Sequence, residues 1–195
     1  QLSGINLVPL AKGECCFTLE ELKDAVTEST SGRVLSSIGA VMIESPVRRQ
    51  MGQVVSFQEM KAMTEYCRDQ VIGTHLDGAR LYMMSAASGI SPREYSALFD
   101  TVYVSLYKYF GAPYGAILAG DSQLIEGMFH TRRMFGGGLA SSYFAAGLAL
   151  KGTKGFEERF GEAMRQGRDL VQRLNTLAGL EIKEFEHGSN IFPLT

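Results

Sequence analysis

The sequence has few of the residues that build metal centres and disulfide frameworks. Its 195 residues include three cysteines and three histidines. Cys15 and Cys16 are adjacent, which makes it hard for both to bind one ion, and Cys67 is remote from them in sequence. Because neither a metal-ligand spacing nor a disulfide pattern is present, we expect free thiols and no metal site.

The sequence also lacks a strong excess of charge and any long apolar run. A formal net charge of -2 gives no reason to expect binding to nucleic acid or to an anionic membrane. No apolar run is long enough to cross a bilayer, and the first residues lack the basic start and apolar centre of a signal peptide. We therefore expect a cytoplasmic protein without nucleic-acid or membrane partners.

The residues that are present are those of an ordinary globular domain. Hydrophobic residues make up 45% of the chain and charged residues 21%. This length is sufficient for one domain with a sizeable core. Segment 37–44 is almost continuously apolar, which predicts a central parallel strand that is covered on both faces.

Secondary structure is predicted from capping signals and apolar patterns. Three capping boxes, Thr18–Glu21, Ser56–Glu59 and Ser91–Glu94, each predict the start of a helix. We expect helices over 19–27, 57–70, 80–88, 122–132, 139–150 and 156–177. A further helix is expected to begin at residue 92. Segment 139–150 is apolar all round and is expected to be buried. We expect strands over 5–10, 37–44, 71–76, 101–106, 116–119, 180–185 and 190–194, and so an α/β fold.

Charged residues follow two of the predicted strands. Asp77 comes directly after strand 71–76, and Lys108 follows strand 101–106. In an open α/β sheet, ligands bind at the carboxyl ends of the strands. We therefore interpret Asp77, Arg80 and Lys108 as the chemical core.

Lys108 has the surroundings of a nucleophilic amine. An amine must be neutral to attack an aldehyde, and a desolvated pocket lowers its pKa toward that form. Tyrosines flank Lys108 on both sides, which favours a pocket over the alternative of a surface lysine. For Asp77 the alternative is a helix N-cap, and the two roles are compatible.

Three motifs carry a family resemblance. In chain order they are HLDGARL, SLYKYFGAPYGAILAG and RRMFGGG. Together they resemble the threonine aldolase and β-eliminating lyase group of enzymes that depend on pyridoxal phosphate (PLP). The resemblance implies the three-layer α/β/α large domain of fold type I, with a mostly parallel sheet. Residues 1–178 would be the central part of that PLP-binding domain and 179–195 the start of a small C-terminal domain, so the chain would be truncated at both ends relative to the family.

The resemblance also implies roles for the residues of the first two motifs. Lys108 would bind the cofactor aldehyde, and Asp77 would keep the pyridine nitrogen protonated so that the ring acts as an electron sink. Ala79 is small enough to lie against a planar ring. Arg80 would contact the cofactor region and the substrate carboxylate, for which a guanidinium is suited; the alternative is a surface ion pair.

Three further residues are candidates for cofactor binding. His75 would share a strand face with Asp77 and could support the ring or bond to Asp77, although a core histidine is an equal alternative. Ser105 resembles positions that touch the cofactor phosphate. Arg133 matches a basic position near the phosphate or at a neighbouring subunit. Ser105 and Arg133 could equally be packing or surface residues.

The sequence departs from the family pattern at positions that bear on substrate choice. Residues 45–50 replace the commoner Thr-His-Asn loop, Ala140 and Ser141 stand where an arginine-glutamine pair often follows the glycines, and Tyr107 replaces a serine or threonine. The phosphate-cradling loop and the ring-stacking residue lie upstream in the family. These departures leave PLP binding as an expectation and the substrate open.

The implied activity is cleavage of a β-hydroxy-α-amino acid, such as threonine, to glycine and an aldehyde. The resemblance implies a small-molecule amino-acid substrate and a homodimer or homotetramer. One alternative keeps PLP but changes the reaction to β-elimination or another amino-acid transformation. The other is a catalytically inactive α/β scaffold.

Overall fold

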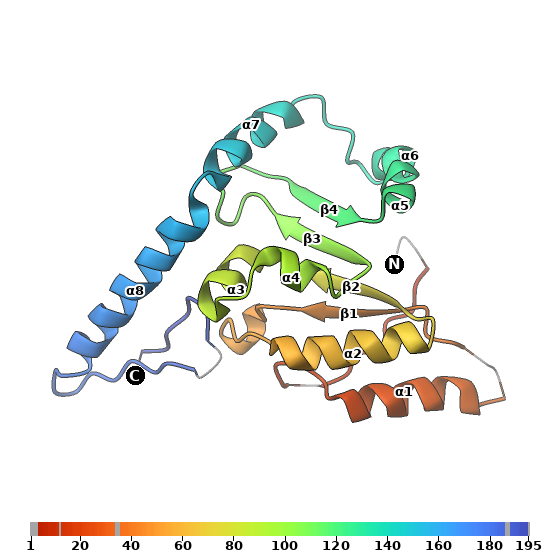
Figure 1. Ribbon diagram of the computed structural model, residues 1–195, viewed down its shortest axis with the longest axis horizontal. Helices are drawn as coiled ribbons and strands as arrows, with labels where there is room; N and C mark the ends of the chain where they lie inside the picture. Colours follow the sequence, from red (N-terminus) through yellow and green to blue (C-terminus); the bar gives the residue numbers. More distant parts are fainter. Residues whose placement is uncertain (1–3, 12, 34–35, 186–187, 195) are drawn as a thin grey trace.

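The computed structural model describes residues 4–11, 13–33, 36–185 and 188–194. The described chain forms one four-stranded sheet with helices around it (Figure 1). The strands are β1 (Ala40–Glu44), β2 (Gly73–Asp77), β3 (Thr101–Ser105) and β4 (Ala116–Gly120). The helices are α1 (Leu19–Ser31), the short 3-10 helix η1 (Arg48–Gln50), α2 (Phe57–Asp69), α3 (Leu81–Ser88), α4 (Pro92–Ser96), α5 (Ser122–Glu126), α6 (Met128–Met134), α7 (Ser142–Thr153) and α8 (Phe156–Leu174).

The sheet has the order β1-β2-β3-β4. β1, β2 and β3 run parallel, and β4 is antiparallel to β3. The parallel strands are connected through helices, as crossover geometry requires. The expected α/β class with a mostly parallel sheet is confirmed.

All three predicted capping boxes are confirmed. In each, the hydroxyl of Thr18, Ser56 or Ser91 accepts the backbone N–H of a glutamate three residues later, at 3.2 Å. Each glutamate carboxylate in turn accepts the backbone N–H of its capping residue. Such caps stabilise a helix by about 1 kcal/mol each. They fix where α1, α2 and α4 begin.

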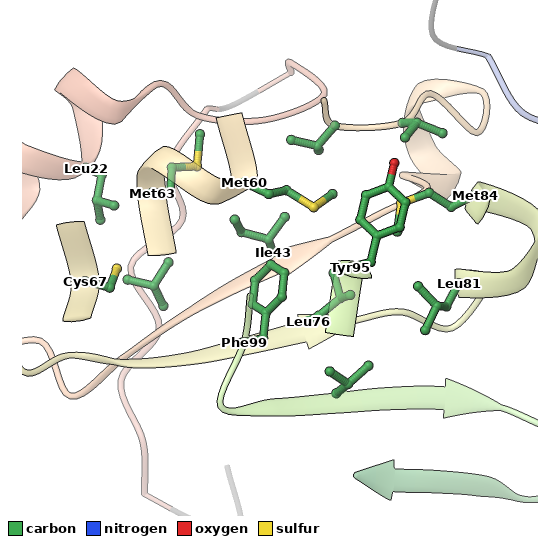
Figure 2. Packing of buried hydrophobic residues seen from close by; sticks show 14 of the residues in the cluster. Leu22, Ile43, Met60, Met63, Cys67, Leu76, Leu81, Met84, Tyr95 and Phe99 are labelled. Carbon is green, nitrogen blue, oxygen red and sulfur yellow. The ribbon is translucent and has the colours of Figure 1, made fainter. Parts of the chain in front are cut away.

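The main core lies between the sheet and helices α2, α3 and α4 (Figure 2). Met60, Met63 and Cys67 lie on one face of α2 and are at most 2% exposed. They pack in the same cluster as Ile43 and Leu76, from β1 and β2. Helix α2 therefore presents one apolar face to the core.

A second, smaller core joins the turn after β3 to helices α7 and α8. It contains Phe110, Ala112, Ala145, Ala149 and Phe156. Gly152 of α7 packs so tightly on this turn that an added Cβ would overlap the Phe110 carbonyl.

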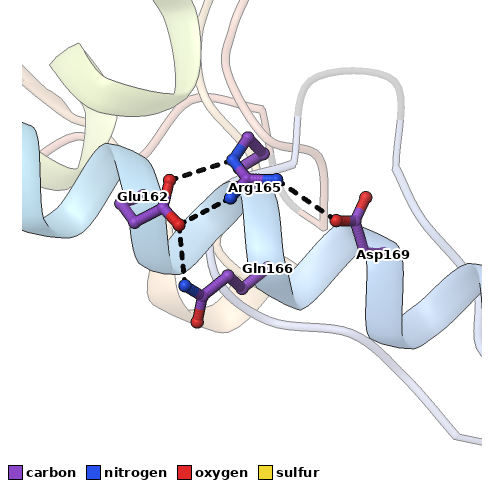
Figure 3. A network of polar contacts seen from close by, with 4 residues as sticks. All are labelled: Glu162, Arg165, Gln166 and Asp169. Atoms are coloured by element: carbon purple, nitrogen blue, oxygen red, sulfur yellow. Dashed lines mark hydrogen bonds and ion pairs between the residues drawn. The ribbon is translucent and has the colours of Figure 1, made fainter.

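Helix α8 is amphipathic. Its inner side buries Phe156, Met164 and Val171. Its outer side carries a polar network of Glu162, Arg165, Gln166 and Asp169 (Figure 3). None of the helices in the described ranges is both long and apolar enough to span a membrane.

Two predictions about apolar segments are wrong. β1 is an edge strand of the described sheet and its burial alternates, with Met42 58% exposed, because helices cover only one of its faces. Segment 5–10 forms no strand. Ile5, Leu7 and Val8 are at least 69% exposed, since no neighbouring strand in the described part pairs with them.

Other predictions fail toward the C-terminus. The helix at 139–150 begins at Ser142, and its large side chains Tyr143, Phe144 and Leu150 are exposed because only the narrow alanine side of α7 contacts the core. The helix at 122–132 is divided at Gly127 into α5 and α6. The strands at 180–185 and 190–194 reduce to one bridge, between Ile182 and Leu194.

Candidate functional site

The parallel strands bring their carboxyl ends to one edge of the sheet. Glu44 is paired with Asp77, and Asp77 with Tyr103. β3 ends two residues after Tyr103, and the turn 106–115 that follows it carries Lys108. The structure therefore brings the predicted carboxylate and the predicted lysine to adjacent strand ends.

Asp77 is the last residue of β2 and is half-buried. Its Oδ1 accepts the backbone N–H of Ala79 at 3.1 Å, which orients the carboxylate toward the following turn. Asp77 is not the N-cap of α3. That position belongs to Arg80, which makes no side-chain capping bond.

The turn between β2 and α3 is tightly packed. A Cβ at Gly78 would lie 3.1 Å from the carbonyl oxygen of Tyr103, which favours glycine there. Ala79 is 6% exposed. Arg80 is half-buried at the start of α3, on the same turn as Asp77.

Lys108 lies in a closed turn. The backbone N–H of Leu106 donates to the carbonyl of Gly115 at 3.0 Å, which joins the two ends of the turn. Lys108 is half-buried, and its Nζ lies 5.8 Å from the ring centroid of Tyr107. Within the described ranges it forms no ion pair with Asp77. Its partial burial argues against a fully solvated surface lysine.

Ser105 is completely buried at the end of β3. It shares a strand face with Tyr103, whose register partner is Asp77. In the described part of the chain its Oγ has no hydrogen-bond partner. Leaving a buried hydroxyl unpaired costs about 1–3 kcal/mol, and this oxygen is free to bond to a group from outside the described chain.

His75 lies on the same face of β2 as Asp77, as predicted. Its Nδ1 is 2.8 Å from the hydroxyl oxygen of Thr101 on β3. Burial lowers the pKa of His75, and the nearby Asp77 acts against that shift. The imidazole is therefore held neutral near pH 7, beside the carboxylate.

Arg133 is not brought to this edge. It is exposed on α6, with its guanidinium 5.8 Å from the ring of Phe129. The chain reaches α5 and α6 from Gly120, which pairs with Thr101 at the amino end of β3. The segments that carry Arg133 and Lys108 therefore leave the sheet at opposite ends of β3.

Tyr109 was not predicted as a functional residue. Its hydroxyl is buried and, among the described residues, has no hydrogen-bond partner. Burial raises the pKa of this phenol, so it stays protonated. Its position next to Lys108 was the only available sequence signal.

One cavity lies elsewhere in the described part of the chain. It measures about 660 Å³ and is lined by residues that include Phe57, Tyr95, Arg168 and Phe192. Lys108 and Asp77 are not among its lining residues. All three cysteines are free, and no group of three metal-ligating side chains occurs in the described ranges.

The fold and the carboxyl ends of β2 and β3 define an α/β domain that carries a lysine and a carboxylate at neighbouring strand ends. The sequence model of one family, the β-eliminating lyases, matches residues 1–193. The chain belongs to the β-eliminating lyase family.

Individual relatives are consistent with this family. A low-specificity L-threonine aldolase of Candida albicans is 34% identical over 135 residues, which cover 69% of this chain and 35% of that protein. An alanine racemase of Cochliobolus carbonum is 40% identical over 88 residues, covering 45% of this chain and 23% of that protein.

Solved structures agree on the fold. A Listeria monocytogenes protein provisionally named L-allo-threonine aldolase superimposes with a TM-score of 0.83 at 32% identity, over all of this chain and 52% of that one. The chain spans little more than a third of the curated aldolase and about half of this structure.

Members of this family depend on PLP, and the residues present fit that cofactor. The unpartnered Ser105 Oγ is suited to donate to a phosphate oxygen. Ala79 presents a small buried surface beside Asp77, where a planar ring can lie. Lys108 and Asp77 carry an amine and a carboxylate of the kinds that such a cofactor would need.

Proposed function

We propose that this chain forms part of a PLP-dependent carbon-carbon lyase of the threonine aldolase type. Its substrate would be a β-hydroxy-α-amino acid, which is cleaved to glycine and an aldehyde. The strand register supports this proposal most directly, because it brings Asp77 and the turn of Lys108 to one edge of the sheet. The similarity to named threonine aldolases points to the same reaction.

Each residue at the edge has a proposed role in cofactor binding. PLP, when bound, supplies an electron sink for the substrate carbon. Lys108 holds the cofactor through its amine, and Asp77 keeps the ring nitrogen protonated. Ala79 supports the face of the ring, and the Ser105 hydroxyl donates to the phosphate. His75 orients Asp77 from the same face of β2.

Arg80 would hold the substrate. Its guanidinium can bind the α-carboxylate with two parallel hydrogen bonds, which fixes the orientation of the Cα–Cβ bond. A base removes the β-hydroxyl proton, the Cα–Cβ bond breaks, the aldehyde leaves and Cα takes up a proton to give glycine. We assign no residue as that base. Arg133 would contribute to the phosphate region of a neighbouring subunit, since it lies away from Lys108 in its own chain.

The assignment of Lys108 can be tested by chemical trapping. The protein is mixed with PLP, treated with borohydride, digested and analysed by mass spectrometry. We expect the pyridoxyl mass on the peptide that contains Lys108, and visible absorbance that disappears on reduction. Lys108→Ala should abolish both signals, whereas the control Lys151→Ala, at an exposed position on α7, should retain them. A label on another lysine, with Lys108 unmodified, would refute the assignment.

A second reaction class is supported by the similarity to the alanine racemase. The same PLP site would then invert or eliminate at an amino acid without breaking Cα–Cβ. Product analysis separates these cases: threonine, allo-threonine and phenylserine yield glycine only through cleavage. D-amino acid from an L-substrate would indicate racemisation, and a keto acid would indicate elimination. An inactive scaffold would bind no PLP.

We also propose a cytoplasmic homo-oligomer, either a dimer or a tetramer. Large side chains of α7, including Tyr143, Phe144, Leu148 and Leu150, are 48–68% exposed, and such a surface is suited to burial against a second copy. The three free thiols are consistent with a reducing compartment. We propose residues 1–178 as part of the large domain and 179–195 as the start of the small domain. Sedimentation analysis tests the oligomer, and a monomer at all concentrations would refute it.

A further inference from the structure

The cavity of about 660 Å³ lies among four helices and the segment that follows α8. Its lining residues come from α2, α3, α4 and α8, from the turns beside α2 and α3, and from segments 184–185 and 188–192. Small-molecule sites in proteins have volumes of about 300–1,000 Å³, so the cavity has the size of a ligand site. The candidate PLP site uses none of these lining residues.

The wall that follows α8 is held by specific contacts. This segment returns from the end of α8 toward the start of α2 (Figure 1). The buried hydroxyl of Ser189 donates to the carbonyl oxygen of Gly52 at 2.6 Å, and a Cβ at Gly52 would lie 3.2 Å from Ile191. The side chain of Asn175 bonds to both the N–H and the carbonyl of Ile182. The wall is therefore an integral part of the fold.

The inner surface of the cavity is largely aromatic. Tyr95 is 1% exposed, and its ring meets that of Phe57 edge to face, with 5.4 Å between centroids. Ile90, Phe185 and Phe192 also line the cavity. Edge-to-face contacts hold rings in defined orientations, and such a surface is suited to an apolar or aromatic ligand body.

Two opposite charges belong to the same cavity. Arg168 of α8 and Glu184 both line it, and within the described ranges neither forms an ion pair. The hydroxyls of Ser56 and Ser88 already bond within the helix layer. A guanidinium pairs with a carboxylate, and a carboxylate accepts hydrogen bonds from an ammonium group. A ligand that carries both charges on an apolar body would satisfy both side chains.

We propose that this cavity is a second ligand site, which binds an apolar α-amino acid such as phenylalanine. The ligand carboxylate would pair with Arg168, its ammonium group with Glu184, and its side chain would pack beside Phe57 and Tyr95. This site is separate from the candidate PLP site, and the proposal does not depend on the reaction that the protein catalyses.

The test is calorimetric titration with three ligands that share one ring. L-phenylalanine carries both charges, 3-phenylpropanoate lacks the ammonium group, and 2-phenylethylamine lacks the carboxylate. The full chain is compared with Lys108→Ala, in which the candidate PLP site has lost its amine. Arg168→Gln and Glu184→Gln each remove one charge. Arg173→Gln is the matched control, because Arg173 is exposed on the same helix and does not line the cavity.

We expect L-phenylalanine to bind the full chain and Lys108→Ala equally well at the cavity. Arg168→Gln should weaken L-phenylalanine and 3-phenylpropanoate roughly threefold to tenfold and leave 2-phenylethylamine unchanged, because only the first two carry a carboxylate. Glu184→Gln should weaken L-phenylalanine and 2-phenylethylamine and leave 3-phenylpropanoate unchanged. Arg173→Gln should change none of the three affinities. Methyl NMR signals of Ile90 and Ile191 should shift on binding.

Several outcomes would overturn the proposal. No binding of L-phenylalanine would refute the site, and binding that is lost in Lys108→Ala would assign the ligand to the candidate PLP site. Equal weakening of all three ligands in a charge variant would show a general disturbance and refute the pairing, as would no weakening. Ala87→Phe fills the cavity and keeps both charges, so unchanged binding in this variant would also refute the site. If Ala87→Phe does not fold, the charge variants and the methyl signals decide.

Discussion

The two faces of strands β1 to β3 differ in what they contribute. Toward helices α2 to α4, the side chains are at most 9% exposed: Val41, Ile43, Leu76 and Val102. On the opposite face, Met42, His75, Asp77 and Tyr103 are half-buried or exposed, and only Ser105, at the end of β3, is buried among the polar side chains named for the site. One face therefore supports the fold, and the other presents the polar groups of the candidate site.

This difference arises from the alternation of a β-strand. Successive side chains point to opposite faces, so Leu76 and Asp77 are neighbours in sequence but belong to different environments. Leu76 is completely buried in the main core, whereas Asp77 accepts a hydrogen bond at the carboxyl edge. Substitutions at adjacent positions should then separate stability from activity.

The largest effect is expected on the core face. Leu76→Ala removes a completely buried side chain and should lower the free energy of unfolding by about 2–5 kcal/mol. Met42→Ala, on the outer face and 58% exposed in the same sheet, is the matched control and should change it far less. Urea denaturation of both variants measures the difference. Equal losses would mean that Met42 is also covered, and the contrast between the faces would not hold.

Asp77→Asn should leave stability unchanged and lower activity. The amide keeps the shape of the carboxylate and can still accept the Ala79 N–H, so the unfolding temperature should stay unchanged. Loss of the negative charge removes the electrostatic partner of the cofactor ring, and kcat should fall roughly a hundredfold. Steady-state kinetics and thermal unfolding on the same sample test both parts. A variant that unfolds as readily as Leu76→Ala would show that Asp77 is structural.

Ser105→Ala should raise the stability of the cofactor-free protein and lower its affinity for PLP. Its hydroxyl is buried without a described partner, so its removal should stabilise the cofactor-free protein by about 1 kcal/mol. The same change removes a donor to the phosphate, and PLP affinity should fall. Titration with PLP and urea denaturation of the cofactor-free protein give the two values. Lower stability together with unchanged PLP affinity would contradict a role for Ser105 in binding.

The features predicted correctly from sequence depend on local interactions. A capping box requires residues only three positions apart, so Ser56 and Glu59 could be recognised directly. Asp77 and Lys108 could be placed at strand ends because apolar runs precede them and parallel strands end at a common edge. Their adjacency then followed from the order of the strands.

The features predicted wrongly depend on what covers a segment. Segments 5–10 and 139–150 have the apolar content of buried elements, yet their large side chains are exposed in the described chain. Met42 is similar, since no described helix lies over its face. Composition shows that a surface can be buried, but the burial itself requires a second surface. Tyr109 was missed because an unpaired hydroxyl is visible only when its surroundings are known.

The smallest effect concerns the pH dependence of stability on the outer face. Burial lowers the pKa of His75 below its ordinary value of 6.5, so between the two pKa values the unfolded chain binds more protons than the folded chain. The contribution of His75 is therefore complete above pH 6.5 and is lost as the pH falls toward the folded-state pKa. His75→Asn should remove this loss while keeping a polar partner for Thr101. Urea denaturation at several pH values from 7.5 to about 5 measures the free-energy difference between the two proteins. That difference should change in favour of the variant as the pH falls. A constant difference would mean that Asp77 cancels the effect of burial on the pKa of His75, and a change in favour of the parent protein would mean that Asp77 outweighs it.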